Sequence, residues 1–479
     1  MKEFDFLLRG GTVVSHELER VADIGITDGK ITALESAVTD SAREVVDATG
    51  LHIFPGLIDS HVHFNDPGRA HWEGIETGSR ALAAGGGTMF FDMPLNSSPP
   101  TLDAASFDKK LLAAQDKSFA DFALWGGLVP GNLDKLEELA ARGVIGFKAF
   151  MSNSGIEDFS CVDDGTLREG MKRAAQLGKL VAVHAESEEI TNSLTEQRLY
   201  RGEVTARDYL DSRPVLAELD AIGRAVELAG ETGCVLHIVH VSSGAGVALV
   251  AGAKQSGVNV TCETCPHYLV LTEADVEKIG ALAKCAPPLR PKSMQDSLWE
   301  YVGNGAVSTI GSDHSPSPPE MKTGENFFKI WGGISGVQHT LSLLLTGFGL
   351  RGQAERDPAL ASTVENAKAP SPLRFAGAVH DALPLIARLT SFNVAQRFNL
   401  PGTKGRLAVG ADADLALVDL REKFPVRTED LFYRHRQSPY VGRALTGRVV
   451  RTILRGQTVF RDGKIISAPT GKFVEPIRR

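Results

Sequence analysis

The segment Asp59-Ser60-His61-Val62-His63 carries residue types that can bind a metal. It follows an apolar run over residues 53–58, which is typical of a buried strand. Residues two apart on a strand face the same side, so the imidazoles of His61 and His63 would project together. Paired imidazoles are common ligands of transition metals. Two ordinary histidines would give the same spacing, so this segment alone only suggests a metal site.

Three further residues of metal-binding type stand at the ends of predicted strands. His184, His240 and Asp313 each follow a short apolar run. The carboxyl ends of barrel strands meet at one face, where the active sites of such barrels lie. Several placements of this kind are hard to explain by packing and predict a metal centre. His237 is predicted to face the opposite side of its strand from His240, as a structural histidine.

Lys148 lies in an unusually apolar segment, Gly146-Phe147-Lys148-Ala149-Phe150-Met151. An ammonium group there is costly unless it is paired or neutral. One interpretation is a lysine whose stem reaches solvent. The other is an amine that has reacted with CO₂, which gives an anionic carbamate able to bridge two metals. The choice between them depends on the residues around Lys148.

The elements that would position these residues alternate between strands and helices, which argues for a parallel sheet. Repetition over this length favours a closed (β/α)₈ barrel, with an open sheet as the alternative. The predicted strands are 88–92, 143–150, 180–184, 235–240, 258–261 and 307–310. The predicted helices between them are 133–142, 166–177, 215–229 and 244–255.

Both ends of the chain are rich in short strands. At the N-terminal end these are 6–8, 12–14, 24–26 and 30–34, and at the C-terminal end 414–418, 449–454 and 458–460. Asp-Gly pairs at 28–29 and 462–463 are hairpin signals. We therefore expect residues 1–52 and 404–479 to form one small β domain, and residues 53–403 to form the barrel.

The composition excludes several classes of protein. The 479 residues are 43% hydrophobic and 23% charged, with a formal net charge of −8, as in a soluble globular protein. This net negative charge does not suggest binding to nucleic acid, and no apolar segment approaches the length needed to span a membrane. Five cysteines do not make a disulfide framework, and the N-terminus lacks the apolar core of a signal peptide. We expect a cytoplasmic protein with neither nucleic-acid nor membrane partners.

Taken together, the motifs resemble those of the amidohydrolase superfamily, and within it the cyclic amidases: allantoinases, dihydropyrimidinases and dihydroorotases. The resemblance covers nearly the whole chain. It rests on Pro55-Gly56-Leu57-Ile58-Asp59-Ser60-His61-Val62-His63, Gly85-Gly86-Gly87-Thr88, Asp92-Met93-Pro94, Phe147-Lys148, His184-Ala185-Glu186, His240-Val241-Ser242-Ser243, Glu263-Thr264-Cys265-Pro266-His267-Tyr268, Pro287-Pro288-Leu289-Arg290, Gly311-Ser312-Asp313-His314 and Gly410-Ala411-Asp412-Ala413-Asp414-Leu415.

The resemblance implies a (β/α)₈ metal-dependent hydrolase barrel with a small β-sandwich built from both termini. It also implies two divalent metal ions with a hydroxide between them. The first ion would be held by His61, His63, Lys148 and Asp313, and the second by Lys148, His184 and His240. Lys148 would be the N6-carboxylysine, and Asp313 the catalytic base and then acid. Zinc is the expected metal, with Co, Mn or Fe as alternatives.

The residues at three positions help to distinguish between the possible substrates. Asn65 stands where similar dihydroorotases carry an Arg for the substrate carboxylate. Asn153 and Gly332 stand where dihydropyrimidinases carry a Tyr and an Asn. The remaining pattern resembles that of allantoinases, which implies hydrolysis of allantoin to allantoate in purine and ureide nitrogen catabolism. The expected contacts to this small, neutral ureide are Asn65, Asn96, Asn153, Ala286 and Ser315.

Two alternatives stay open at this stage. One is a cyclic amidase of hydantoinase or dihydropyrimidinase type. The other is a non-catalytic interaction protein on the same scaffold, which the intact set of six ligands disfavours. Relatives are commonly tetramers, so the resemblance implies a homo-oligomer. The loop at 315–330 follows Asp313 and is a candidate lid, and the Cys262-Cys265 pair is interpreted as structural thiols.

Overall fold

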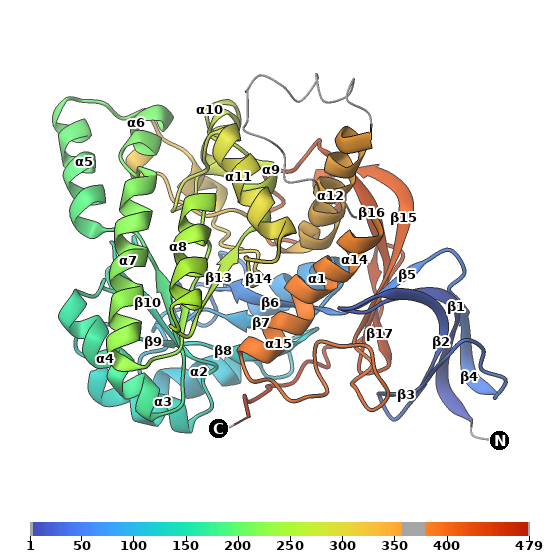
Figure 1. Cartoon of the computed structure of the whole chain (residues 1–479). Coiled ribbons are helices and arrows are strands. Elements are labelled where there is room, and N and C mark those ends of the chain that lie inside the picture. The colour runs from blue at the N-terminus through green and yellow to red at the C-terminus, as the bar shows by residue number, and fades with distance from the viewer. Residues whose placement is uncertain (1–2, 357–378, 478–479) are drawn as a thin grey trace.

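The computed structural model describes residues 3–356 and 379–477. Parallel strands form a barrel in the middle of the chain (Figure 1). They are β6 (Leu57–Val62), β7 (Gly87–Asp92), β8 (Asp121–Leu124), β9 (Gly126–Gly127), β10 (Phe147–Phe150), β11 (Val181–His184), β12 (Leu236–Ile238), β13 (Val260–Thr264) and β14 (Thr309–Ile310).

Closure of the barrel depends on two junctions between a three-stranded sheet and a six-stranded sheet. β9 continues the path of β8 and pairs in parallel with β10. On the other side, Val62 forms an isolated bridge with His314, and the His63 amide donates to the His314 carbonyl at 2.8 Å. The second junction brings the segments after β6 and β14 together, and these segments carry His63 and Asp313.

Helices cover the outside of the barrel (Figure 1). In the longest of them, α7, buried Ala221, Ile222, Ala225 and Leu228 recur at helical spacing and face the strands. The helices are α1 (Ile75–Ala84), α2 (Ala104–Ala114), α3 (Leu136–Ala141), α4 (Asp164–Gln176), α5 (Glu188–Tyr200), α6 (Ala206–Asp211), α7 (Val215–Thr232), α8 (Gly244–Gln255), α9 (Pro266–Val270), α10 (Glu273–Ile279), α11 (Lys292–Gly303), α12 (Thr340–Arg356), α14 (Val379–Ala387) and α15 (Asn393–Arg397).

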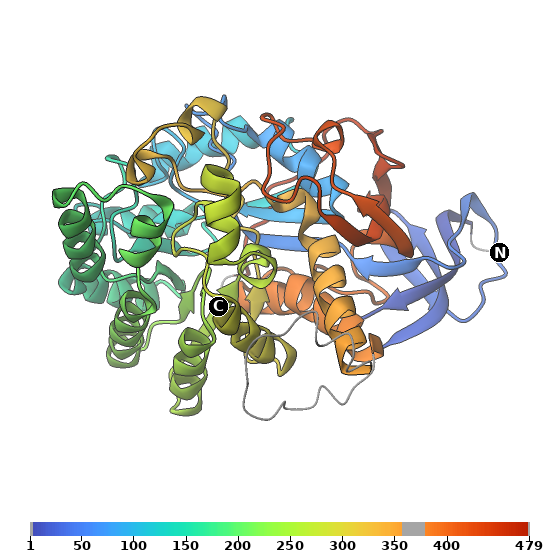
Figure 2. The same cartoon turned by 90° about the horizontal axis from the view of Figure 1, so that it is seen from above.

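A nine-stranded sheet joins the two ends of the chain beside the barrel (Figures 1 and 2). β5 and β15 pair antiparallel, with Leu415 opposite Pro55, and this pairing connects the two sets of strands. The N-terminal set is β1 (Phe4–Val14), β2 (Glu19–Thr27), β3 (Lys30–Glu35), β4 (Ala42–Asp47) and β5 (His52–Pro55). The C-terminal set is β15 (Leu415–Pro425), β16 (Ala444–Leu454), β17 (Gln457–Arg461) and β18 (Lys464–Ile465).

The predicted fold class is confirmed, and some predicted strands differ in detail. The predicted strands 6–8 and 12–14 are one strand, β1, whose pairing shifts register between Leu8 and Gly11. β10 begins only at Phe147, since Gly143 has a φ of 87° and turns the chain. The exact domain boundaries stay a prediction, and residues 357–378 of the predicted barrel lie outside the described residues. None of the helices in the described ranges is long and apolar enough to span a membrane.

Candidate metal centre

His61, His63 and Asp313 form a cluster at the carboxyl end of the barrel. The Nε2 atoms of His61 and His63 lie 3.3 and 3.5 Å from Oδ1 of Asp313. One donor atom from each residue lies within 4.8 Å of the others. Burial raises the pKa of the Asp313 carboxyl, but the neighbouring imidazoles outweigh this and lower it to about 2. Asp313 is therefore a carboxylate, and the three side chains can hold one cation.

His184 and His240 form a second pair beside this cluster. His184 Nδ1 and His240 Nε2 lie 3.0 Å apart, and the His61 and His240 rings have centroids 5.3 Å apart. Burial holds the pKa of His240 well below its ordinary value, so the ring is neutral and can act as a ligand. His240 has a φ of 40°, because the chain leaves the extended conformation after β12 ends at Ile238. Two facing imidazole nitrogens suit a second cation.

Lys148 completes the predicted set from the middle of β10. Its side chain is fully buried, and Nζ has no hydrogen-bond partner among the described residues. Nζ lies 4.8 Å from the centroid of the Phe150 ring. Burial lowers its pKa to about 7, although the Asp313 and Glu263 carboxylates oppose the shift. A buried amine without a partner fits the predicted conversion to a carbamate.

Glu263 fixes the orientation of His61 from below. Its Oε1 lies 2.8 Å from His61 Nδ1, so Nε2 of the same ring points towards Asp313. A Cβ on Gly311 would lie 2.6 Å from Glu263 Oε2, so only glycine leaves room for this carboxylate. His237 was predicted to face away from the site, but its Nε2 lies 3.9 Å from Glu263 Oε2. Both His237 and His240 reach the barrel interior, since the strand ends between them.

Glu186 holds His184 in a similar way. Its Oε2 lies 2.9 Å from His184 Nε2, which leaves Nδ1 facing His240. Arg213 pairs with both oxygens of Glu186, with Nε at 3.1 Å from Oε1 and Nη2 at 2.6 Å from Oε2. Burial disfavours the Glu186 carboxylate, but Arg213 and His184 lower its pKa to about 2. Carboxylates that orient metal-binding histidines in this way are a common feature of metal sites.

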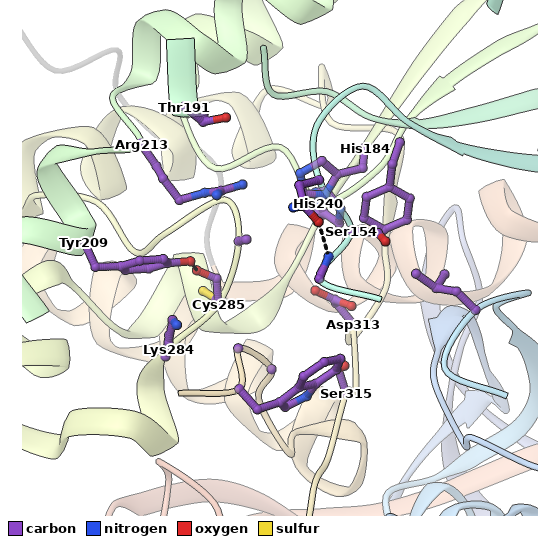
Figure 3. A pocket seen from close by; sticks show the side chains of 18 of the residues that line it. Ser154, His184, Thr191, Tyr209, Arg213, His240, Lys284, Cys285, Asp313 and Ser315 are labelled. Carbon is purple, nitrogen blue, oxygen red and sulfur yellow. Dashed lines mark hydrogen bonds between the residues drawn. The ribbon is translucent and has the colours of Figure 1, made fainter. Parts of the chain in front are cut away.

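A cavity of about 370 Å³ opens above these ligands. Figure 3 shows Tyr209, Arg213 and Lys284 across the cavity from His184, His240 and Asp313. Of the predicted substrate contacts, Asn96, Asn153, Ala286 and Ser315 line this cavity. Asn65 is buried and is absent from the lining, with its Nδ2 3.5 Å from the Pro316 carbonyl.

The wall formed by residues 327–333 is tied down by two lysines. Lys284 Nζ donates to the carbonyls of Phe327 and Ile330 at 2.7 and 2.5 Å. Lys322 Nζ donates to those of Trp331 and Gly333 at 3.0 and 2.6 Å. These contacts fasten the C-terminal end of the predicted candidate lid, residues 315–330, in this structure.

Sequence reasoning did not assign roles to four of these residues. Glu186 and Glu263 were part of the recognised motifs, and their places at or just beyond strand ends were a usable signal. Arg213 and Lys284 gave no comparable signal, because they reach the cavity from segments remote in the chain.

Comparisons with known proteins place this site in a family. The model of the family described as "Amidohydrolase family" matches residues 52–459. The chain belongs to the amidohydrolase family. The predicted family and enzyme class are confirmed, and because amidohydrolases are metal-dependent, the His61–His63–Asp313 group meets a requirement of the family.

The similar amidohydrolases include curated relatives and solved structures. The allantoinase of Rubrobacter xylanophilus is 54% identical over 100% of this chain and 99% of its own length. That of Deinococcus radiodurans is 51% identical over 98% and 99%. The structure of the L-hydantoinase of Arthrobacter aurescens matches with a TM-score of 0.90 and 34% identity, over 98% of this chain and 100% of that one.

Proposed function

We propose that this amidohydrolase opens the hydantoin ring of allantoin to give allantoate. The observation that carries the proposal is that the chain is 54% and 51% identical to curated allantoinases over nearly its full length. The contacts among His61, His63 and Asp313, and between His184 and His240, support it. The runner-up is hydantoin or dihydropyrimidine opening, which the L-hydantoinase structure favours through its fold. A non-catalytic role is disfavoured, because a buried cluster of histidines and a carboxylate has little structural use without metal.

The donor set fits two divalent ions. His61, His63 and Asp313 would hold one, His184 and His240 the other, and Lys148 as a carbamate would contribute to both. Such a carbamate forms when the neutral amine adds to CO₂ and releases a proton, and the pKa of about 7 supports a substantial neutral fraction. Zinc is the metal we propose, since neutral imidazoles and carboxylates suit it, and Co, Mn or Fe would also be accepted.

The chain's own groups then handle the proton. Metal ions in such a site acidify a water molecule and polarise the carbonyl that it attacks. Asp313 accepts the proton of that water at its carboxylate and delivers it to the departing ring nitrogen. Glu263 and Glu186 keep the rings of His61 and His184 in place throughout.

The cavity suits a neutral substrate. Arg213 is already paired with Glu186, and Lys284 donates to backbone carbonyls, so neither is available to clamp a substrate carboxylate. Asn96, Asn153, Ser315 and the backbone of Ala286 supply polar groups for a ureide. Asn65 would act indirectly, through the segment after Ser315. A cytoplasmic location and a tetrameric assembly stay predictions.

Ring opening is the direct test. The protein is reconstituted with zinc and bicarbonate and incubated with allantoin, hydantoin, dihydrouracil or dihydroorotate in parallel. We expect allantoate to form fastest. Preferential opening of another ring would overturn the substrate while keeping the metal chemistry. If none of the four compounds is hydrolysed by a sample that contains two metal ions per chain, the proposed enzymatic activity is wrong.

A further inference from the structure

A second cavity lies at the junction between the barrel and the nine-stranded sheet. Its volume is about 610 Å³, compared with about 370 Å³ for the candidate active site. Its walls come from α1, from the start of α12, and from the loop that connects β15 to β16. The two cavities share none of their lining residues.

Arginine dominates the charge of this second cavity. Its lining contains five arginines and two carboxylates: Arg80, Arg427, Arg434, Arg436 and Arg448, with Glu429 and Asp430. Two of these arginines already have carboxylate partners outside the lining, since Arg80 pairs with Glu76 at 2.7 Å and Arg448 with Glu422 at 2.5 Å. The guanidinium of Arg448 also lies over the Phe424 ring at 4.3 Å. Within the described part of the chain, Arg427 and Arg436 form no ion pair or side-chain hydrogen bond, so both are available to a ligand.

A buried histidine also belongs to the lining of this cavity. His339 is 5% exposed and belongs to the lining, and its Nδ1 has no hydrogen-bond partner among the described residues. Burial lowers its pKa to about 4, so the ring is neutral and offers one N–H group. The Nε of Arg80 is likewise buried and unsatisfied. Both atoms are enclosed, so a ligand in the cavity would meet other parts of these two side chains.

We propose that this cavity is a binding site for a small organic phosphate, which acts as an effector of the enzyme. Guanidinium forks pair bidentately with phosphate oxygens, which favours phosphate over a simple halide ion. A cavity of this size holds a small organic phosphate, and the two lining arginines without a partner among the described residues, Arg427 and Arg436, are its expected contacts.

The loop between β15 and β16 connects this cavity to the candidate active site. The Arg434 amide donates to Glu73 Oε1 at 3.2 Å, and Glu73 Oε2 lies 3.7 Å from His314 Nε2. The ring of Tyr433, which lines the cavity, lies 5.0 Å from the His314 ring. His314 follows Asp313 and accepts a hydrogen bond from the His63 amide. A bound phosphate would therefore affect the positions of the segments that carry Asp313 and His63. This effector role rests on the proposed hydrolysis.

Calorimetric titration of the metal-loaded enzyme with fructose 1,6-bisphosphate tests the site, with fructose as the uncharged control. The metal content is measured afterwards to exclude chelation. We expect saturable binding of one molecule per chain. The Arg427→Gln/Arg436→Gln variant should weaken binding at least tenfold. The Arg9→Gln/Arg201→Gln variant, which changes the charge equally at two exposed arginines outside the cavity, should bind normally.

Three results would overturn parts of the proposal. If binding is not saturable, or if both variants weaken it equally, the cavity is a solvated arginine surface and not a binding site. If the Arg427→Gln/Arg436→Gln variant loses probe binding and light scattering also shows a changed oligomer mass, the cavity would be part of an interface with a second copy of the chain. Binding without any change in the rate of allantoin opening would refute the effector role alone. Because binding is measured without turnover, a failure of the site is distinguishable from a failure of the proposed function.

Discussion

Lys148 has to change its charge to serve as a ligand. Replacing it by Ala should lower allantoin opening by about a hundredfold or more and reduce the retained metal, because the proposed carbamate would be lost. Acetate should restore part of the activity by placing a carboxylate in the vacated space, and chloride at equal ionic strength should not. Metal analysis and initial rates measure both effects. Full activity of the Ala variant without added carboxylate would rule out the carbamate.

Glu186 acts on His184 and should affect metal retention rather than substrate binding. Glu186→Gln weakens the contact to His184 Nε2 and leaves Arg213 without a charged partner. We expect metal affinity to fall by roughly 10- to 100-fold. Glu188→Gln is the matched control, because Glu188 also lines the cavity but contacts the Asn153 amide. Dialysis against a chelator should separate the two variants, and similar metal loss from both would contradict this role.

At the level of single residues, five of the six proposed ligands stood out because His61, His63, His184, His240 and Asp313 are metal-binding types in or just after a strand. Lys148 was assigned through the family resemblance. The supporting partners of these ligands were not predictable, since a pattern along the chain does not reveal contacts across it. Glu263 reaches His61 from about 200 positions away, and its motif drew attention to the cysteines instead. His237 was misplaced because residue parity was extended beyond the end of β12.

At the scale of the elements, two lysines hold the loop between β14 and α12 in place. The Nζ groups of Lys284 and Lys322 donate hydrogen bonds to backbone carbonyls of this loop. Hydrogen bonds to charged groups contribute about 1.5–3 kcal/mol each, so removing one lysine should loosen the cavity wall. We expect Lys322→Met to raise KM for allantoin about tenfold with a smaller change in kcat. Amide exchange in residues 319–333 should become faster.

Lys329→Met is the matched control for that experiment. Lys329 lies on the same loop and is exposed, and its side chain makes no hydrogen bond within the described residues. Because Lys329 also lines the candidate active-site cavity, the control concerns the loop alone: amide exchange in residues 319–333 should stay nearly unchanged. If both variants loosened the loop equally, the carbonyl contacts of Lys322 would not be what holds it.

Periodicity predicted the alternation of elements well, but their ends less well. β14 has two residues where four were expected. The residues on either side of it still form backbone hydrogen bonds to the neighbouring strand, but they lie outside the regular strand. The barrel closure at His314 involves an isolated bridge and left no pattern in the sequence. The hairpin at Asp28-Gly29 was predictable, since both residues adopt the positive φ that this dipeptide favours.

On the scale of the whole molecule, a buried charge cluster fastens the barrel to the nine-stranded sheet. Lys404 is 5% exposed, and its Nζ lies 2.6 Å from Asp121 at the start of β8 and 2.7 Å from Asp414 just before β15. Burial lowers the pKa of the Lys404 ammonium, but the two carboxylates outweigh this and raise it. Among the described residues, removing the cation leaves Asp414 without a charged partner, whereas Asp121 keeps its ion pair with Arg455.

Lys404→Met should therefore destabilise the protein by about 3–5 kcal/mol, the usual cost of breaking a buried ion pair on one side. Lys30→Met is the matched control, because Lys30 contacts Asp412 at 2.8 Å but its side chain is 47% exposed, so its loss should cost less than about 1 kcal/mol. Urea unfolding at neutral pH measures both. Since the cluster spans the barrel and the sheet, we also expect the Lys404 variant to unfold in two transitions and the native chain to unfold in one. Equal stability of the two variants would mean that packing alone joins the two parts.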